Sequence, residues 1–229
     1  MSNTYAETNK RLISERERLA LSVQQLSDLI YVDQSNWCKI EQGKGRISYK
    51  CMKNLCAADV DMYYVLTGKK KKYDNYNGLE EFEIPELVNL IKLMNSVAGL
   101  CYRKRQCELW KDICENTGYI WAVDTEADVK KFLVSLRKIK GYSQKEFAEI
   151  LGMDIKKLQN MEKGARFPDN ELICRLYDEF RVSPGILLED RNCLINEVCC
   201  LLEKMVAADG GFVLDFWDLI TKWFMNAKH

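Results

Sequence analysis

Amide, hydroxyl and lysine side chains occupy equivalent places in two copies of one sequence pattern. Residues 22–43 read SVQQLSDLIYVDQSNWCKIEQG and residues 143–164 read SQKEFAEILGMDIKKLQNMEKG, at an offset of 121 positions (164 minus 43). The polar residues of interest are Gln34, Ser35, Asn36 and Lys39 in copy one, and Lys156, Lys157, Gln159 and Asn160 in copy two. In the major groove of DNA, amides can hydrogen-bond to adenine and lysine to guanine. These residues are therefore candidates for reading bases in double-stranded DNA.

Two short helices joined by a tight turn would present these side chains. Ser22 and Ser143 are typical N-caps of the first helix, because Gln or Glu follows each of them three residues later in a capping-box pattern. Asp33 and Asp154 are typical N-caps of the second helix, which a glycine ends in both copies. Such a helix fits the major groove, about 12 Å wide, when its back is apolar and its front is polar. The pattern predicts this arrangement in both copies.

Both copies resemble the Cro/C1-type helix-turn-helix family, which includes phage repressors and xenobiotic-response-element regulators. The resemblance covers about 10–68 and 129–188, and its most specific part is the pattern apolar-Glu-x-Gly at 40–43 and 161–164. The helix start Ser143-Gln144-x-x-Phe147-Ala148 and the ending at 65–69 add to it. The family implies base contacts from Lys156, Lys157 and Asn160 in copy two and from Gln34, Ser35 and Lys39 in copy one. It also implies phosphate contacts, which fix the register on DNA without reading sequence, from Gln144, Lys163 and Arg166 in copy two and from Lys44 and Arg46 in copy one.

Copy one departs from the family pattern at three places. Val23 replaces the usual Gln, Leu26-Ser27 replaces an apolar-Ala pair, and Tyr31 replaces the turn glycine. We expect Tyr31 to widen the angle between the two helices. Copy one is therefore either a weaker DNA reader or a protein-binding surface, and copy two is the stronger candidate.

The chain is predicted to be all-α, with two tandem lambda-repressor-like helix-turn-helix domains, each followed by a helical hairpin appendage. Apolar residues recur at helical spacing, and the chain has only three prolines. The expected organisation is a first domain at 1–72, a helical linker or interaction segment at 73–125, a second domain at 126–191 and a C-terminal helical interaction segment at 192–229. The appendages show a weak repeat of their own, in which Trp110 matches Trp217 at an offset of 107 positions. Linkers are expected at 69–79 and 118–128.

The charge is uneven although the formal total is zero. Residues 129–167 contain ten basic and four acidic residues, and a run of acidic residues follows. The N-terminal sequence lacks the apolar stretch of a signal peptide and we found no apolar run of about 20 residues, so we expect a soluble cytoplasmic protein with reduced thiols and no membrane contact.

No enzyme motif stands out among the titratable residues. The single histidine is His229, and no nucleophile elbow, phosphate-binding glycine loop or CxxC pair is present. We expect no catalytic residue, no cofactor and no metal site, because a zinc site would need cysteines scattered along the chain. Glu41 and Glu162 are expected to be structural. The cysteines are expected to pack as small apolar side chains, with a thiol redox sensor as the alternative.

The leading hypothesis is a sequence-specific, DNA-binding transcription regulator, a repressor of phage or mobile-element type. The alternative is an interaction protein, an anti-defence inhibitor or antitoxin-like partner, that uses one module for DNA autoregulation and the other for a protein. The aromatic residues of the C-terminal segment predict an interface, either with the first appendage or with a second chain in a homodimer: Phe212, Phe216, Trp217, Trp223 and Phe224.

Overall fold

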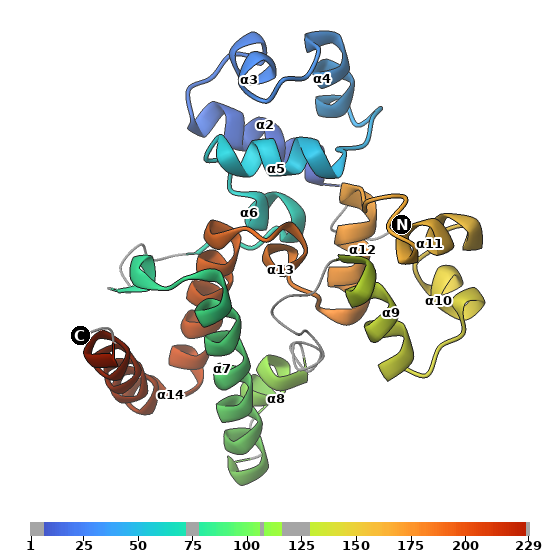
Figure 1. Ribbon diagram of the computed structural model, residues 1–229. Coiled ribbons are helices and arrows are strands. Elements are labelled where there is room, and N and C mark those ends of the chain that lie inside the picture. Colours follow the sequence, from blue (N-terminus) through green and yellow to red (C-terminus); the bar gives the residue numbers. More distant parts are fainter. Residues whose placement is uncertain (1–6, 72–77, 106–107, 116–128, 228–229) are drawn as a thin grey trace.

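The computed structural model describes residues 7–71, 78–105, 108–115 and 129–227, and every element in these ranges is helical (Figure 1). The prediction of an all-α chain is confirmed. The predicted linker at 118–128 lies outside the described residues, as do the thiol of Cys107 and the side chains of Cys114 and Phe224.

Two five-helix units repeat along the chain. Unit 1, residues 8–67, consists of α2 (Thr8–Arg18), α3 (Val23–Leu29), α4 (Gln34–Glu41), α5 (Tyr49–Ala57) and α6 (Met62–Thr67). Unit 2, residues 129–188, consists of α9 (Val129–Ile139), α10 (Gln144–Ile150), α11 (Ile155–Glu162), α12 (Asn170–Phe180) and α13 (Pro184–Leu188). The first four helices of each unit begin 121 positions apart and the fifth 122 apart, so unit 2 has one extra residue before its last helix.

Local sequence explains where these helices begin. The hydroxyl oxygens of Ser22 and Ser143 each accept a hydrogen bond, 3.2 Å long, from the backbone N–H three residues later. The Gln or Glu at that position accepts one in return from the backbone of the serine, so both capping boxes are complete. The carboxylates of Asp33 and Asp154 cap α4 and α11 in the same way.

The appendages pack on each other within one chain. The first is a hairpin of α7 (Ile84–Arg105) and α8 (Glu108–Glu115), preceded by the short helix η1 (Leu79–Glu81). The second is α14 (Arg191–Ala227), which is interrupted at Asp209 (φ −163°, ψ 85°) and changes direction there (Figure 1). Trp110 and Trp217 are buried in one apolar cluster formed by both appendages. Of the two interfaces predicted for the C-terminal aromatic residues, Trp217 thus forms the one with the first appendage.

Helix α7 is long and apolar enough to cross a membrane, by length and composition alone, a property that the sequence analysis overlooked. Its apolar side is occupied in the fold, because Leu87, Val88, Ile91 and Met94 are buried in the cluster shared with α14. A core helix of a water-soluble protein has the same composition, so α7 is weak evidence for a membrane.

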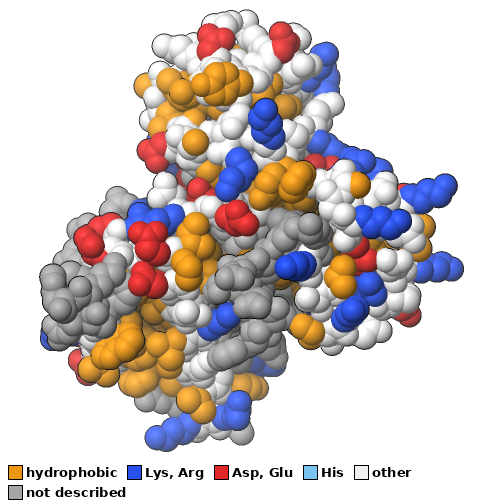
Figure 2. Space-filling view, in the orientation of Figure 1, with side chains coloured by type: hydrophobic (Ala, Val, Ile, Leu, Met, Phe, Trp, Pro, Cys, Tyr) orange, Lys and Arg blue, Asp and Glu red, His pale blue; other side chains and the backbone are white. Residues whose placement is uncertain are grey.

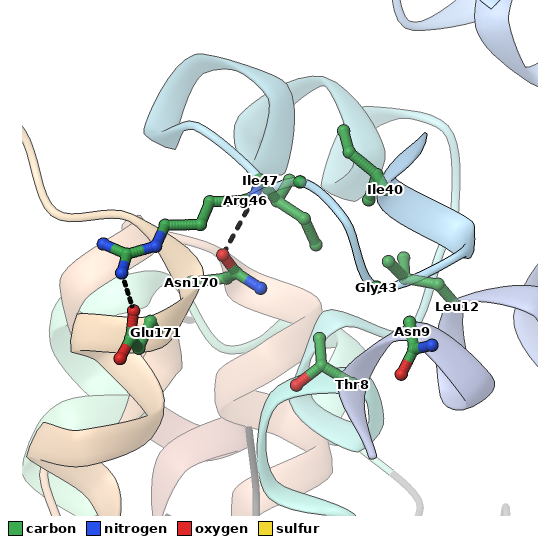
Figure 3. Close-up of a pocket in the computed structure, with 10 residues that line it drawn as sticks. Thr8, Asn9, Leu12, Ile40, Gly43, Arg46, Ile47, Asn170 and Glu171 are labelled. Atoms are coloured by element: carbon green, nitrogen blue, oxygen red, sulfur yellow. Dashed lines mark hydrogen bonds and ion pairs between the residues drawn. The ribbon is translucent and has the colours of Figure 1, made fainter. Parts of the chain in front are cut away.

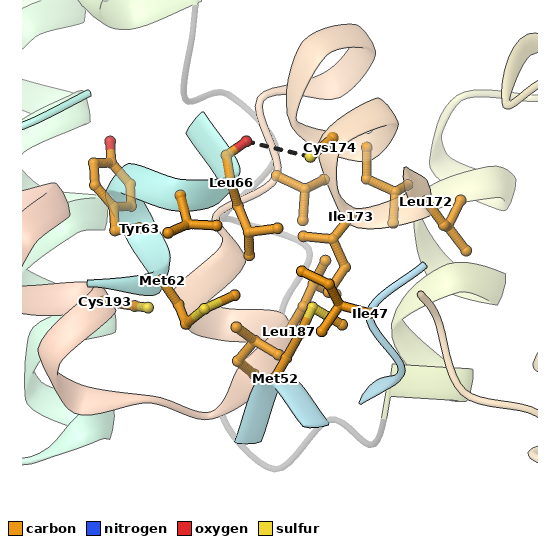
Figure 4. Packing of buried hydrophobic residues seen from close by; sticks show 14 of the residues in the cluster. Ile47, Met52, Met62, Tyr63, Leu66, Leu172, Ile173, Cys174, Leu187 and Cys193 are labelled. Atoms are coloured by element: carbon orange, nitrogen blue, oxygen red, sulfur yellow. Dashed lines mark hydrogen bonds between the residues drawn. The ribbon is translucent and has the colours of Figure 1, made fainter. Parts of the chain in front are cut away.

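A second apolar cluster joins the two units (Figure 4). Its centre contains Met52 and Leu66 of unit 1 with Ile173 and Leu187 of unit 2. Met52 and Ile173 are equivalent, 121 positions apart, and Leu66 and Leu187 come from the equivalent last helices, where the offset is 122 and the counterpart of Leu66 is Leu188, which belongs to the same cluster. Both units therefore present the same side to the shared core.

Contacts at the edge of the interface between the units are approximately reciprocal. Arg46 of unit 1 contacts the start of α12, where its guanidinium pairs with Asp169 at 3.1 Å. In the opposite direction, Phe167, the counterpart of Arg46, stacks on Tyr49 at the start of α5, with ring centroids 5.0 Å apart. The loop before the fourth helix of each unit thus packs on the start of the fourth helix of the other unit.

A second reciprocal pair lies deeper in the same interface. The ammonium of Lys53 on α5 donates to the carbonyl oxygen of Leu188 at the end of α13. Cys174 on α12, the counterpart of Lys53, donates from its thiol to the carbonyl oxygen of Leu66 near the end of α6, at 3.4 Å. Reciprocal contacts between equivalent positions are the mark of a two-fold arrangement, such as that of a homodimer.

Candidate nucleic-acid interface

Helix α11 exposes most of the residues predicted to read bases in copy two. Lys156, Lys157 and Asn160 are exposed, whereas Leu158 and Met161 on the opposite side of the helix are buried against the unit. The helix packs on α10 and α9. The apolar back and polar front expected of this helix are both present.

Helix α4 has the same arrangement in unit 1. Gln34, Ser35, Asn36 and Lys39 are exposed, and Trp37 is fully buried behind them. The hydroxyl of Ser35 donates to the capping carboxylate of Asp33 at 2.6 Å, so its proton is already used, while its oxygen can still accept a hydrogen bond.

A partly buried ion pair holds each of these helices in the same way. In unit 2 the guanidinium of Arg137 on α9 donates to Glu162 at the end of α11, at 2.6 Å, and to the carbonyl oxygen of Tyr142 at 3.2 Å. In unit 1 the corresponding bonds run from Arg16 to Glu41 at 2.7 Å and to the carbonyl oxygen of Leu21 at 3.0 Å.

Glu41 and Glu162 were expected to be structural, whereas the arginines that bind them were not among the expected residues. The available signal was the 121-position repeat itself, which also relates Arg16 to Arg137.

Two predicted contact residues of unit 2 are engaged within the unit. The amide nitrogen of Gln144 donates to Glu162 at 2.6 Å, and the amide nitrogen of Gln159 donates to the amide oxygen of Gln144 at 3.2 Å. Both side chains are half-buried. These hydrogen bonds hold α11 against α10. A contact of either glutamine with DNA would use the amide atoms that do not take part in these bonds. Burial raises the pKa of Glu162, but the hydrogen bonds from Arg137 and Gln144 outweigh it and leave the pKa below its usual value.

Three of the residues predicted to hold phosphate are exposed: Lys44, Lys163 and Arg166. Arg46 is exposed as well, but its guanidinium is also engaged by unit 2. Its guanidinium forms ion pairs with Asp169 and, as Figure 3 shows, with Glu171 of unit 2. Two carboxylates thus compensate its charge, and a contact with phosphate would compete with these ion pairs.

The turns before α4 and α11 have the same backbone conformation. Tyr31 and Gly152 both have φ +57°, and the following residues, Val32 and Met153, donate to carbonyl oxygens that are likewise equivalent, at 3.0 and 2.9 Å. The local backbone of this turn is therefore the same with Tyr31 as with Gly152, and the predicted widening of the angle between the two helices stays a prediction. Tyr31 itself is 89% exposed.

The two units differ in what lies above this turn. A Cβ atom at Gly152 would come within 1.8 Å of the guanidinium of Arg175. At the equivalent position unit 1 has Asn54, whose amide donates to the carbonyl oxygen of Ile30 at 2.8 Å. Unit 2 thus places an arginine over its turn, and unit 1 places a shorter side chain there.

A pocket of about 350 Å³ lies behind α4, where the two units meet (Figure 3). Ile40 on the back of α4 and Leu12 on α2 line it from unit 1, and Asn170 lines it from unit 2. The side-chain oxygen of Asn170 accepts from the backbone N–H of Ile47 at 2.9 Å. This bond fixes the loop after α4 on unit 2, so the position of the loop depends on the contact between the units.

Positive charge is concentrated on unit 2. Figure 2 shows lysine and arginine side chains gathered over the region of α10 and α11. Residues 129–167 carry ten basic and four acidic residues, whereas the equivalent residues 8–46 carry seven basic and five acidic ones. The field near unit 2 therefore favours a polyanion more than the field near unit 1.

No model of a known protein family matches the chain, and neither the curated proteins nor the solved structures contain a significant match.

Proposed function

We propose that the protein is a sequence-specific transcription regulator that binds double-stranded DNA with two tandem Cro/C1-type, lambda-repressor-like helix-turn-helix domains. Units 1 and 2 are these domains, and the helical appendages join them. On this proposal the protein acts in the cytoplasm and is not an enzyme. Its support is structural, because each unit carries a second helix, a tight turn and a third helix whose polar side is exposed.

The observation that carries the proposal is the exposed face of α11. A helix that reads bases must project small donors and cations while its back is fixed to the rest of its domain. Lys156, Lys157 and Asn160 are exposed, and the ion pair between Arg137 and Glu162 fixes the end of the helix to α9. Lys163 and Arg166 follow at once and are also exposed, which suits contacts with the adjacent phosphates.

Two domains with reciprocal contacts suggest an operator with two half-sites. A homodimer would require identical half-sites, but α4 and α11 expose different side chains. We therefore expect two unlike half-sites, with centres about 10 bp or a multiple of it apart if both domains meet one face of the duplex. Occupying a promoter would be enough to repress it, as a repressor of phage or mobile-element type does.

The experiment starts with in vitro selection of bound DNA, followed by footprinting of the selected site. The double variant Lys156→Ala/Asn160→Ala should then lose about 100-fold or more in specific affinity, since each base contact contributes about 1–3 kcal/mol. Lys104→Ala is the control, because it removes one positive charge from an exposed position on α7. Wild-type affinity should also fall steeply as salt rises.

Two results would contradict the proposal. One is a wild-type protein that selects no DNA sequence. The other is a double variant that folds, as shown by circular dichroism, and still binds the selected site as tightly as the Lys104→Ala control.

A second function has an observation of its own in unit 1. Leu29 is 50% exposed and Tyr31 is 89% exposed beside α4, so this face offers apolar area that phosphate cannot use. Unit 1 would then bind a protein while unit 2 binds DNA for autoregulation, as in an anti-defence inhibitor or an antitoxin-like partner. A footprint that covers a single half-site, and that does not change in a Lys39→Ala variant, would favour this reading. A homodimer formed through the appendages would instead give a footprint with four half-sites.

A further inference from the structure

Two cysteines and a carboxylate from distant parts of the chain meet at one point. They are Cys56 on α5 of unit 1, Asp190 between α13 and α14, and Cys193 in the first turn of α14. The two sulfur atoms and a carboxylate oxygen all lie within 4.8 Å of one another. Cys193 is 2% exposed, and the other two residues are half-buried, which leaves a path from solvent.

Backbone contacts fix two of the three groups. The carboxylate of Asp190 caps α14 by accepting from the backbone N–H of Cys193 at 2.7 Å. The backbone N–H of Asp190 in turn donates to the carbonyl oxygen of Gly185 at 3.0 Å. The cap uses one carboxylate oxygen, and a carboxylate can bind a metal ion through its other oxygen.

We propose that Cys56, Asp190 and Cys193 form a binding site for one Zn²⁺ ion. Thiolates are soft ligands that select zinc over magnesium or calcium, and zinc accepts sulfur together with a carboxylate oxygen in tetrahedral geometry. Three protein ligands leave the fourth position to a water molecule. Zinc takes the place of the two thiol protons. Binding releases both thiol protons to the solvent.

This site connects parts of the fold that are far apart in sequence. Cys56 belongs to unit 1, and Cys193 belongs to the helix that follows unit 2. The sequence analysis expected no metal site because the cysteines are scattered, and folding removes that objection for this pair. An ion that clips two distant segments stabilises the folded chain by its binding free energy. The site thus tethers unit 1 to the C-terminal helices, independently of any contact with DNA.

The test uses the full chain, reduced with a phosphine and freed of metal, with Co²⁺ as the spectroscopic probe. We expect one equivalent of Co²⁺ to produce a thiolate-to-cobalt charge-transfer band that one equivalent of Zn²⁺ then removes. Zn²⁺ should raise the melting temperature of the wild-type protein. Cys56→Ser should lose the band and bind Zn²⁺ at least about tenfold more weakly, since even indirect supports of a metal site contribute that much.

Asp190→Asn keeps a good helix cap but removes the charged ligand, so it separates metal binding from folding. It should fold like the wild type and show the same loss of Zn²⁺ affinity. Cys101→Ser, which changes a half-buried thiol on α7, is the matched control and should keep the band.

Three outcomes would overturn the site: no band in the wild type, an equal band in Cys56→Ser, or a melting temperature that Zn²⁺ raises equally in all variants. Mass spectrometry that finds a Cys56–Cys193 disulfide in a protein that binds no Zn²⁺ would replace the metal site with a redox pair.

Discussion

In unit 1 the carboxylate of Glu41 accepts a hydrogen bond of 2.9 Å from the indole of Trp37, whereas in unit 2 the equivalent Glu162 accepts one of 2.6 Å from the amide of Gln144. Both carboxylates keep the same arginine partner from the first helix of their unit. The ion pair is thus the constant part of the scaffold, and the third partner can change. Unit 1 has Val23 at the position of Gln144, and the indole of Trp37 supplies the hydrogen bond that the glutamine supplies in unit 2.

The units also differ in the charge around this common scaffold. Residues 129–167 have a net charge of +6, from ten basic and four acidic residues, and the equivalent residues 8–46 have +2, from seven and five. The interface between the units adds to the difference, because it engages Arg46 of unit 1 in ion pairs, while its counterpart in unit 2 is the uncharged Phe167. Equal backbones therefore do not imply equal affinity for a polyanion.

The largest expected effect is loss of the ion pair. Glu162→Gln should lower the free energy of unfolding by about 3 kcal/mol, because it leaves the guanidinium of Arg137 without its countercharge. Glu41→Gln should cost a similar amount in unit 1. Urea unfolding measures both, with Glu149→Gln, an exposed position, as the control. A difference of more than about 2 kcal/mol between the two variants would show that the scaffolds are not equivalent.

The next effect concerns pH and the cap of the last helix in each unit. Ser183, the cap of α13, donates to the buried Glu197 of α14, while the equivalent cap Asp61 is itself a carboxylate paired with Asn196 of α14. Burial raises the pKa of Glu197 to about 7 from 4.5, although Lys69 nearby favours the charged form. Burial raises the pKa of Asp61 as well.

Because the folded pKa of Glu197 is raised, the folded state holds a proton that the unfolded state has already released between about pH 4.5 and 7. Glu197 therefore stabilises the folded state fully below about pH 4.5. Its contribution to the free energy of unfolding declines by up to about 3 kcal/mol as the pH rises to about 7. Glu197→Gln should remove this decline and make the protein more stable than the wild type at pH 8. Thermal unfolding between pH 4 and 8 measures it, and parallel curves for the two proteins would contradict the assignment.

Exchanging the turn residues Tyr31 and Gly152 between the units should change the free energy of unfolding in opposite directions. Gly152→Tyr should destabilise by about 2 kcal/mol, because φ is +57° and Arg175 occupies the space above the residue. Tyr31→Gly should stabilise by about 1 kcal/mol by relieving the same conformation. Adding Arg175→Asn gives unit 2 the residue that unit 1 has at Asn54, and it should restore part of the stability that Gly152→Tyr loses. Destabilisation by Tyr31→Gly would mean that the exposed ring makes a contact worth more than the strain.

The smallest effect distinguishes two arginines at neighbouring places in the repeat. Arg46→Ala should lower the free energy of unfolding by about 0.5 kcal/mol, since its ion pairs are half-exposed, and should leave the salt dependence of DNA binding unchanged. Arg166→Ala should leave stability unchanged but reduce the slope of log affinity against log salt by about 1. The reverse pattern would return Arg46 to the phosphate contacts.

Sequence reasoning could predict the features that depend on neighbouring residues. The caps at Ser22, Ser143, Asp33 and Asp154 and the all-helical content follow from local hydrogen bonding and periodicity. Contacts between residues that are far apart in the sequence could not be predicted in this way. Arg46 is taken up by carboxylates 123 and 125 positions away, and the thiols of Cys56 and Cys193 meet only once α5 packs near α14. The exposure of Lys156 and Asn160 agrees with the predicted reading face, but no sequence pattern indicated that Gln159 would bond to Gln144.

The reciprocal interface has a consequence for how the protein would respond to dilution. Two separate subunits that met through these contacts would come apart as their concentration fell, and their activity would follow the amount of protein in the cell. Here the partners belong to one polypeptide, so each unit meets the other at an effective concentration set by the connecting segment. Occupancy of a two-part target should then follow the number of molecules in direct proportion, without the threshold that dimerisation imposes.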